Sequence, residues 1–221
     1  MAHSFSFLEM FLMAGTITAL KIQKHNKERV NIYLDDKYAL AVTAIVAATL
    51  TKGQYLTDAE IEQLRDHDER DKAYEQSIRF LGYRARSQAE VERHLQQKEY
   101  SPEVISETVD RLLAQHYLDD EAFARTWLND RQRFRPRSQQ ALRYELRQKG
   151  VAEEVISTAL SDLDETELAW AAMKQKLFQW QHLSEDDFKK KALGYLGRRG
   201  FNYELARAVA ERAWTVLNSA K

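Results

Sequence analysis

The residues best suited to chemistry in this sequence are basic, and they gather in two segments. Residues 131–149 hold seven basic side chains and one acidic side chain, and residues 189–199 hold five basic side chains and no acid. Guanidinium and ammonium groups at this density can bind phosphates or an acidic protein surface. The first segment contributes Arg131, Arg133, Arg135, Arg137, Arg143, Arg147 and Lys149, and the second contributes Lys189, Lys190, Lys191, Arg198 and Arg199.

The spacing of the first segment places its charges on a helix and on the loop before it. Arg143 and Arg147 lie one helical turn apart, whereas Leu142 and Leu146 mark the adjacent inward face. The arginines around Pro136 are expected at a helix end and loop, from which guanidinium groups can reach phosphates. We predict that the first segment forms one binding surface and that the second extends it. An ordinary solvated helix face is the alternative.

The sequence gives little support for a catalytic site or a metal site. The chain has no Cys, and its six His residues show no HExxH spacing. Gly194, Gly197 and Gly200 lack the strand and the Lys-Ser/Thr ending of a phosphate loop, so we expect the first two to allow close helix packing and the third to end a helix in the left-handed conformation. Asp119 and Asp120 are interpreted as the start of a helix. We therefore predict a non-enzyme without metal or cofactor.

Composition predicts a mainly helical protein. The 221 residues carry 33 Lys+Arg against 34 Asp+Glu, and only 7 Gly and 2 Pro interrupt them. The absence of Cys is typical of the reducing cytoplasm, where we expect this protein, and no apolar run approaches the length of a membrane span. Residues 57–75 hold eight acids against three bases, a segment that could face a basic protein surface.

Strand signals are confined to residues 16–43. Alternating apolar residues on both sides of Asp35 and Asp36 predict a hairpin, and residues 16–24 predict a third strand. A short helix is expected over residues 44–50. From Thr57 onward the pattern becomes helical, and Thr57 with Glu60 forms a capping box.

The helical part contains an internal repeat. Placing residues 86–88 over residues 137–139, an offset of 51, gives ten identities in 24 ungapped positions, and a weaker third copy follows at an offset of 50. Each copy predicts three helices, and stacked copies predict an elongated, curved array behind a small N-terminal β cap. The expected divisions are a loosely ordered extension (1–13), the cap (14–56), an acidic helix with the first repeat (57–115), the second repeat (116–163) and the third repeat (164–221).

At these motifs the sequence resembles the RecX family, which regulates the RecA recombinase in bacteria, over roughly residues 14–217. Two positions, Glu99 and His116, depart from the family pattern, which has Gly there. If these positions need the left-handed conformation, a side chain costs about 1 kcal/mol at each. The matching motifs are Arg84-Ala85-Arg86-Ser87, Tyr117-Leu118-Asp119-Asp120 with Phe123-Ala124, Leu146 with Lys149-Gly150-Val151, and Leu196 with Arg199-Gly200-Phe201.

The resemblance implies a regulator that binds the RecA filament on single-stranded DNA and restrains filament growth, ATP hydrolysis and strand exchange. It adds Arg84 and Arg86 to the candidate contacts with DNA or the filament, and we expect a monomer that does not bind membranes. A helical DNA-binding protein or a repeat adaptor without recombinase specificity is the alternative. The sequence leaves open which RecA surfaces are contacted, whether DNA is contacted directly, how inhibition and activation balance, and whether Met1 or Met13 is the natural start.

Overall fold

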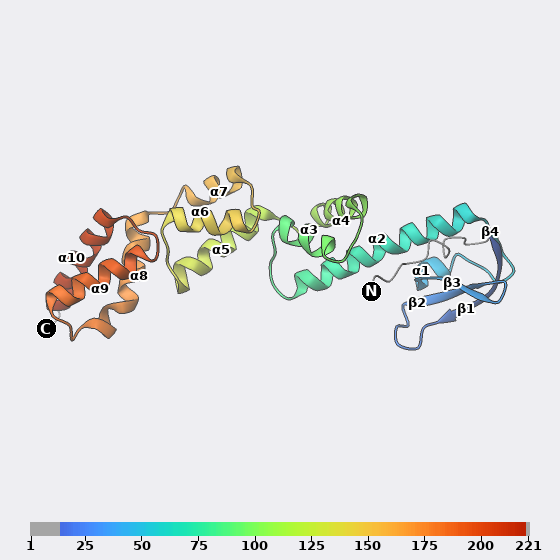
Figure 1. The fold of residues 1–221 in the computed structure, drawn as a ribbon, viewed down its shortest axis with the longest axis horizontal. Helices are drawn as coiled ribbons and strands as arrows, with labels where there is room; N and C mark the ends of the chain where they lie inside the picture. Colours follow the sequence, from blue (N-terminus) through green and yellow to red (C-terminus); the bar gives the residue numbers. More distant parts are fainter. Residues whose placement is uncertain (1–13, 220–221) are drawn as a thin grey trace, which may run out of the picture. The chain divides into compact units, whose positions relative to one another are not determined.

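The computed structural model describes residues 14–219, which form an antiparallel sheet followed by helices (Figure 1). The expected extension at residues 1–13 lies outside this range. The contacts divide the chain into two compact units. Within the described range, one contains residues 14–79 together with 99–108, and the other contains 80–98 together with 109–219.

The sheet has the order β3-β2-β1-β4, with antiparallel neighbours. Asp35 and Asp36 join β2 to β3 with φ angles of 46° and 65°, the left-handed pair that a tight two-residue hairpin needs. The three predicted strands are confirmed. The two-residue β4 was not predicted because it is too short to show periodicity, and α1 is shorter than the helix expected over residues 44–50. The bounds are β1 Gly15–Ile22, β2 Arg29–Leu34, β3 Lys37–Thr43, α1 Ala44–Ala47 and β4 Tyr55–Leu56.

Helix α2 (Asp58–Gly82) begins at the predicted capping box and is tied to the sheet by a buried charge. The Thr57 N–H donates to Glu60 Oε2 at 2.8 Å, and the Glu60 N–H donates to Thr57 Oγ1 at 3.3 Å. Further along the helix, the buried Asp68 accepts two hydrogen bonds from the guanidinium of Arg29 on β2. This pair fixes α2 against the small sheet.

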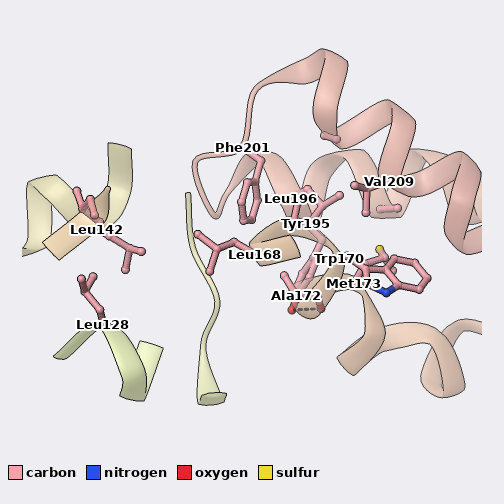
Figure 2. Close-up of a cluster of buried hydrophobic side chains, with 14 of the residues drawn as sticks. Leu128, Leu142, Leu168, Trp170, Ala172, Met173, Tyr195, Leu196, Phe201 and Val209 are labelled. Carbon is pink, nitrogen blue, oxygen red and sulfur yellow. Dashed lines mark hydrogen bonds between the residues drawn. The ribbon is translucent and has the colours of Figure 1, made fainter. Parts of the chain in front are cut away.

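Eight further helices follow α2 in the described range. The first two complete a set of three with α2, and the other six form two more sets of three. One hydrophobic cluster runs through α5–α10 (Figure 2). Leu128 and Leu142 contribute from one set, and Met173, Leu196 and Val209 from the next. The mainly helical class is therefore confirmed. The bounds are α3 Gln88–Gln96, α4 Pro102–Ala114, α5 Asp120–Phe134, α6 Gln139–Gln148, α7 Glu153–Leu160, α8 Glu165–Trp180, α9 Glu185–Gly197 and α10 Tyr203–Ser219.

The glycine predictions succeed at one position and fail at two. Gly200 has a φ of 89°, which confirms the left-handed helix end, and Glu99 and His116 hold the same conformation at 64° and 59°. The expectation that Gly194 and Gly197 allow close helix packing is wrong. A Cβ at Gly197 would meet nothing within 4 Å, and one at Gly194 would meet only the Arg198 side chain at 3.4 Å.

Candidate nucleic-acid interface

Consecutive helix sets meet at two junctions, and at each a serine donates a hydrogen bond to a backbone carbonyl oxygen. We call α2–α4, α5–α7 and α8–α10 repeats 1, 2 and 3. At the first junction, between repeats 1 and 2, Ser87 Oγ donates to the carbonyl oxygen of Lys149 at 2.5 Å. At the second junction, between repeats 2 and 3, the Ser138 N–H donates to the carbonyl oxygen of Arg199 at 3.0 Å. Each junction therefore joins the start of one repeat's middle helix to the end of the next repeat's middle helix.

A second contact recurs beside the first. The N–H of Gln88 donates to Asp120 Oδ1 at 2.9 Å, and the N–H of Gln139 donates to Glu165 Oε2 at 2.8 Å. In both cases the first residue of one repeat's middle helix binds the carboxylate that opens the next repeat, which satisfies a free amide of the helix N-terminus. Burial raises the pKa of Asp120, although the hydrogen bond from Gln88 opposes that rise. Asp119 caps α5 as predicted, by accepting the Ala122 N–H at 2.8 Å.

Two glycines allow the repeats to approach closely at these junctions. Gly150 has a φ of 80°, and a Cβ there would lie 2.3 Å from the Cβ of Ala89. A Cβ at Gly200 would lie 2.4 Å from Ser138 Oγ and 3.1 Å from the Cβ of Ala141. Real Cβ atoms do not approach this closely, so both positions need glycine for space as well as for backbone conformation.

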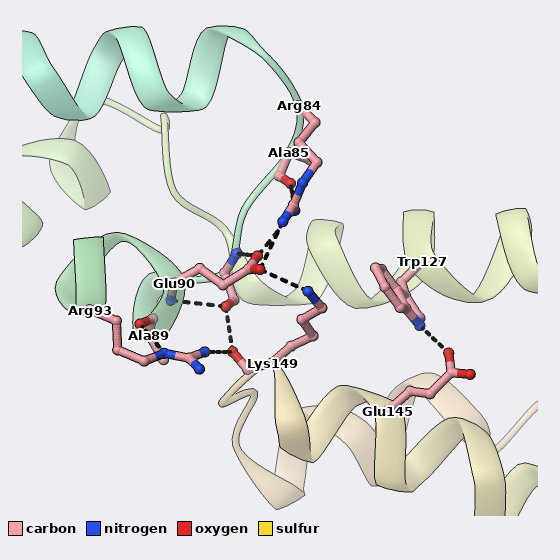
Figure 3. A network of polar contacts seen from close by, with 9 residues as sticks. Arg84, Ala85, Ala89, Glu90, Arg93, Trp127, Glu145 and Lys149 are labelled. Atoms are coloured by element: carbon pink, nitrogen blue, oxygen red, sulfur yellow. Dashed lines mark hydrogen bonds and ion pairs between the residues drawn. The ribbon is translucent and has the colours of Figure 1, made fainter. Parts of the chain in front are cut away.

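The first junction holds a network of paired charges (Figure 3). Glu90 accepts from Arg84 at 2.9 Å and from the Lys149 ammonium at 2.8 Å, so one carboxylate joins two bases that lie far apart in the sequence. Burial alone would raise the pKa of Glu90, but the hydrogen bonds and charges of Arg84 and Lys149 lower it to about 2. The carboxylate therefore stays ionised throughout the neutral range and offsets one of the two positive charges.

A second acid, Glu145 on α6, lies beside this junction and binds side chains of repeat 2. It accepts from Trp127 Nε1 at 2.9 Å and from Arg131 Nε at 2.6 Å, and it pairs with Arg137 at 3.2 Å. The guanidinium of Arg131 lies 4.4 Å from the Trp127 ring centroid, and the Lys149 ammonium lies 5.2 Å from it. Bases of the first segment are thus paired with carboxylates and packed on an aromatic ring.

The single surface predicted for the first segment is wrong. Arg143 and Arg147 both pair with Glu153 on α7, the latter at 2.7 Å. Glu145 lies two residues from each of them, about 200° around the helix, so the bases held by Glu145 lie on the opposite side of α6. The positive charge of residues 131–149 looked uncompensated in the sequence because Glu90 and Glu153 lie outside that range. Whether Arg143 and Arg147 also bind a partner stays a prediction.

The second segment and Arg86 have mixed surroundings. Lys189 pairs with Glu185 at 2.5 Å, and Lys191 lies 5.1 Å from the Trp180 ring centroid. Lys190 and Arg198 are exposed, and no ion pair to either is found within residues 14–219. Arg86 lies 3.9 Å over the Phe80 ring, and its Nε has no hydrogen-bond partner there.

Sequence reasoning missed the residues that organise these bases, namely Glu90, Glu145, Glu153 and Trp127. The sequence did contain a signal for the junction at which Glu90 lies. The internal repeat aligns Ser87 with Ser138 and Lys98 with Lys149, and so it marks the two ends of a middle helix that take part in the junctions. The alignment by itself does not show that one repeat's start meets the next repeat's end. That information comes only from packing.

The chain matches known proteins along most of its length. Residues 15–57 match the family model "Regulatory protein RecX N-terminal domain", residues 73–112 match "RecX, first three-helix domain", and residues 119–160 match "RecX, second three-helix domain". The regulatory protein RecX of Bacillus subtilis is 37% identical over 201 residues, covering 89% of this chain and 76% of the relative. That of Listeria monocytogenes serovar 1/2a is 32% identical over 209 residues, covering 92% and 78%.

Two solved structures are also similar. A crystal structure of regulatory protein RecX superposes with a TM-score of 0.67 and 26% identity, covering 90% of this chain and 100% of that one. A crystal structure of RecX from Lactobacillus salivarius gives a TM-score of 0.57 and covers 66% of this chain and 97% of that one. Its identity of 19% supports the fold alone.

Proposed function

The chain belongs to the RecX family of regulatory proteins, and we propose from this membership that it regulates a RecA recombinase. It binds the RecA filament assembled on single-stranded DNA and restrains filament growth, ATP hydrolysis and strand exchange. The observation that carries the proposal is the match to RecX across both the sheet and two three-helix domains.

The charge distribution supports a polyanionic target. Arg133, Arg135, Lys190, Lys191 and Arg198 are exposed, and within the described residues they make no ion pair with a carboxylate. Their positions in repeats 2 and 3 allow several weak contacts along one extended target, and contacts linked in one chain reinforce one another. All fourteen basic candidates, including those with internal partners, remain proposed contacts with the filament or its DNA.

We further propose a cytoplasmic monomer without catalytic or cofactor chemistry of its own. Residues 14–219 contain no group of three or more His, Cys, Asp or Glu side chains arranged to hold a metal ion. None of the helices in that range combines the length and apolar character that crossing a membrane requires.

Binding to DNA with and without recombinase tests the proposal. Single-stranded DNA is immobilised bare or coated with RecA, held by a slowly hydrolysed ATP analogue, and the chain is passed over both. We expect binding to the coated strand to be at least about tenfold tighter, because recombinase and DNA contacts add in one complex. Equal affinity for both strands would contradict the proposal and favour a DNA-binding protein without recombinase specificity.

A further inference from the structure

Basic residues occupy matched positions at the two junctions, but the acidic residues of the first junction have no acidic counterparts at the second. The repeat offset of 51 places Arg84 on Arg135 and Glu90 on Ala141. The offset of 50 then places Lys149 on Arg199 and Glu145 on Tyr195. The second junction therefore has basic residues at matched positions, while alanine and tyrosine stand where the first junction has its two carboxylates.

A third base is matched through the helix caps. Arg131 and Lys176 each lie 12 residues after the aspartate that caps their helix, Asp119 for α5 (131 − 119) and Asp164 for α8 (176 − 164). At the first junction Arg131 pairs with Glu145. At the second, the Lys176 ammonium lies 5.7 Å from the ring centroid of Tyr195, which occupies the place of that acid.

Tyr195 holds these cations without neutralising them. The Arg199 guanidinium lies 4.5 Å from the same ring centroid and donates to the carbonyl oxygen of Pro136 at 2.9 Å. A ring face attracts a cation through its quadrupole but carries no net charge. Within residues 14–219 no carboxylate pairs with Arg199 or Lys176, and Glu165 at this junction accepts the Gln139 N–H instead. Arg199 and Lys176 therefore keep their positive charge for an external anion.

The C-terminal end of α5 adds two bases and an exposed aromatic ring. Phe134, the last residue of α5, is 62% exposed and lies between Arg133 and Arg135, which are both exposed. The Arg133 guanidinium lies 5.1 Å from the Phe134 ring centroid. Gln175 of α8 donates to the Arg133 carbonyl oxygen at 3.4 Å, which ties the end of α5 to repeat 3. We call Arg133, Phe134, Arg135, Lys176 and Arg199 the second-junction cluster.

Cations without carboxylate partners beside an exposed aromatic ring have the chemistry of a single-strand nucleic-acid site. Guanidinium and ammonium groups bind successive phosphates, and an unpaired base can stack on the ring, whereas a duplex hides its base faces. We propose that the second-junction cluster binds the phosphodiester backbone of single-stranded nucleic acid, with a base stacked on Phe134. At the first junction, Glu90 and Glu145 pair with the bases and so weaken their attraction for phosphate. The inference deepens the proposed function and rests on it for the polymer that the chain meets.

The test measures binding of the full chain to labelled oligothymidylate without recombinase, over a series of salt concentrations. Arg133→Gln with Arg135→Gln removes two exposed charges. If both contact phosphates, the slope of log affinity against log salt becomes shallower by about 1.4, and affinity at about 0.1 M salt falls about 25-fold. The control is Arg125→Gln with Arg207→Gln, which changes the net charge equally at exposed sites outside the cluster. It should leave both quantities near those of the parent chain.

Two further variants test the comparison between junctions. Ala141→Glu installs at the second junction the acid that the first junction has, and it should also weaken binding and flatten the salt slope. Phe134→Ala should weaken binding to oligothymidylate about fivefold or more, the loss of one stacked base, without changing the salt slope. Thermal unfolding of each variant confirms that it folds. If Ala141→Glu does not fold, the double variant Arg133→Gln with Arg135→Gln still tests the site, because both side chains are exposed.

The outcomes separate this inference from the proposed function. Wild-type affinity in the Arg133 and Arg135 double variant, or an equal loss in the control, would overturn the second-junction cluster as the site. Tighter binding of the chain to polyglutamate than to oligothymidylate would overturn it in favour of an acidic protein surface. No recombinase is present in these measurements. The cluster can therefore be supported even if the chain fails to prefer RecA-coated DNA, and a preference for RecA-coated DNA can be found even if the cluster is overturned.

Discussion

Replacing Asp68 with alanine is expected to lower the free energy of unfolding by about 3 kcal/mol. Asp68 and Arg29 have side chains that are 8% and 10% exposed, and the carboxylate also pairs with Lys72 at 2.7 Å. Removing it leaves the Arg29 guanidinium buried with the Ala41 carbonyl oxygen at 3.1 Å as its hydrogen-bond acceptor. An uncompensated buried charge is far more costly than a lost surface pair. Urea denaturation of the full chain measures the change.

The matched control for Asp68 is an exposed pair on the same helix. Glu75 and Arg79 are 3.3 Å apart at i,i+4 spacing, and their side chains are 42% and 72% exposed. Glu75→Ala should change the free energy of unfolding by no more than about 0.5 kcal/mol. Similar small effects for Asp68→Ala and Glu75→Ala would show that the Arg29 pair does not hold α2 on the sheet.

Gly150→Ala is expected to destabilise the repeats by about 3 kcal/mol. The added methyl group would strain a backbone at φ 80° and would lie 2.3 Å from the Cβ of Ala89. That Cβ is attached directly to the α3 backbone, so relief requires the two repeats to move apart at the first junction. The free energy of unfolding, again from urea denaturation, gives the magnitude.

Substitutions at two other glycines separate the cost of backbone strain from the cost of a steric clash. Gly53 has a φ of 91°, and a methyl group added there would meet nothing within 4 Å, so Gly53→Ala should cost only about 1 kcal/mol, the strain alone. Gly197 ends α9 with the same open space and no left-handed φ, so Gly197→Ala should be neutral or slightly stabilising. If Gly150→Ala costs no more than Gly53→Ala, the close approach at the junction is not what requires glycine.

Most of the helices and strands could be predicted from local patterns in the sequence. Thr57 and Glu60 mark the start of α2, and Asp35 and Asp36 mark the hairpin turn, because each depends on hydrogen bonds or torsions within a few residues. The internal repeat predicted helical triplets because the apolar spacing recurs. The two-residue β4 could not be predicted, since its strand conformation depends on pairing with β1 rather than on its own sequence.

The organisation of the basic residues could not be predicted from the sequence. Glu90 reaches Lys149 across 59 residues, and Glu153 reaches Arg143 from the next helix. A count of charges along the chain cannot include such partners. The repeat offsets align Ala141 with Glu90 and Tyr195 with Glu145, but only the packed repeats show that these positions lie beside the bases.

The structure changes how the role of Arg143 and Arg147 should be tested. Because both pair with Glu153, substitution by glutamate would bring three carboxylates together and disturb folding as well as binding. Glutamine at both positions removes the charges without that repulsion. The exposed Arg133 and Arg135 carry no such internal partner in the described part of the chain, so their replacement reports more directly on contact with a polyanion.

The central claim is that this chain restrains a RecA filament, and the rate of ATP hydrolysis tests it most directly. RecA from the same organism is assembled on single-stranded DNA, and its steady-state hydrolysis rate is followed as the chain is added. We predict that the rate falls progressively with the concentration of the chain, because a restrained filament has fewer active protomers. An unchanged or increased rate, at concentrations where the chain is bound to the filament, would contradict the claim.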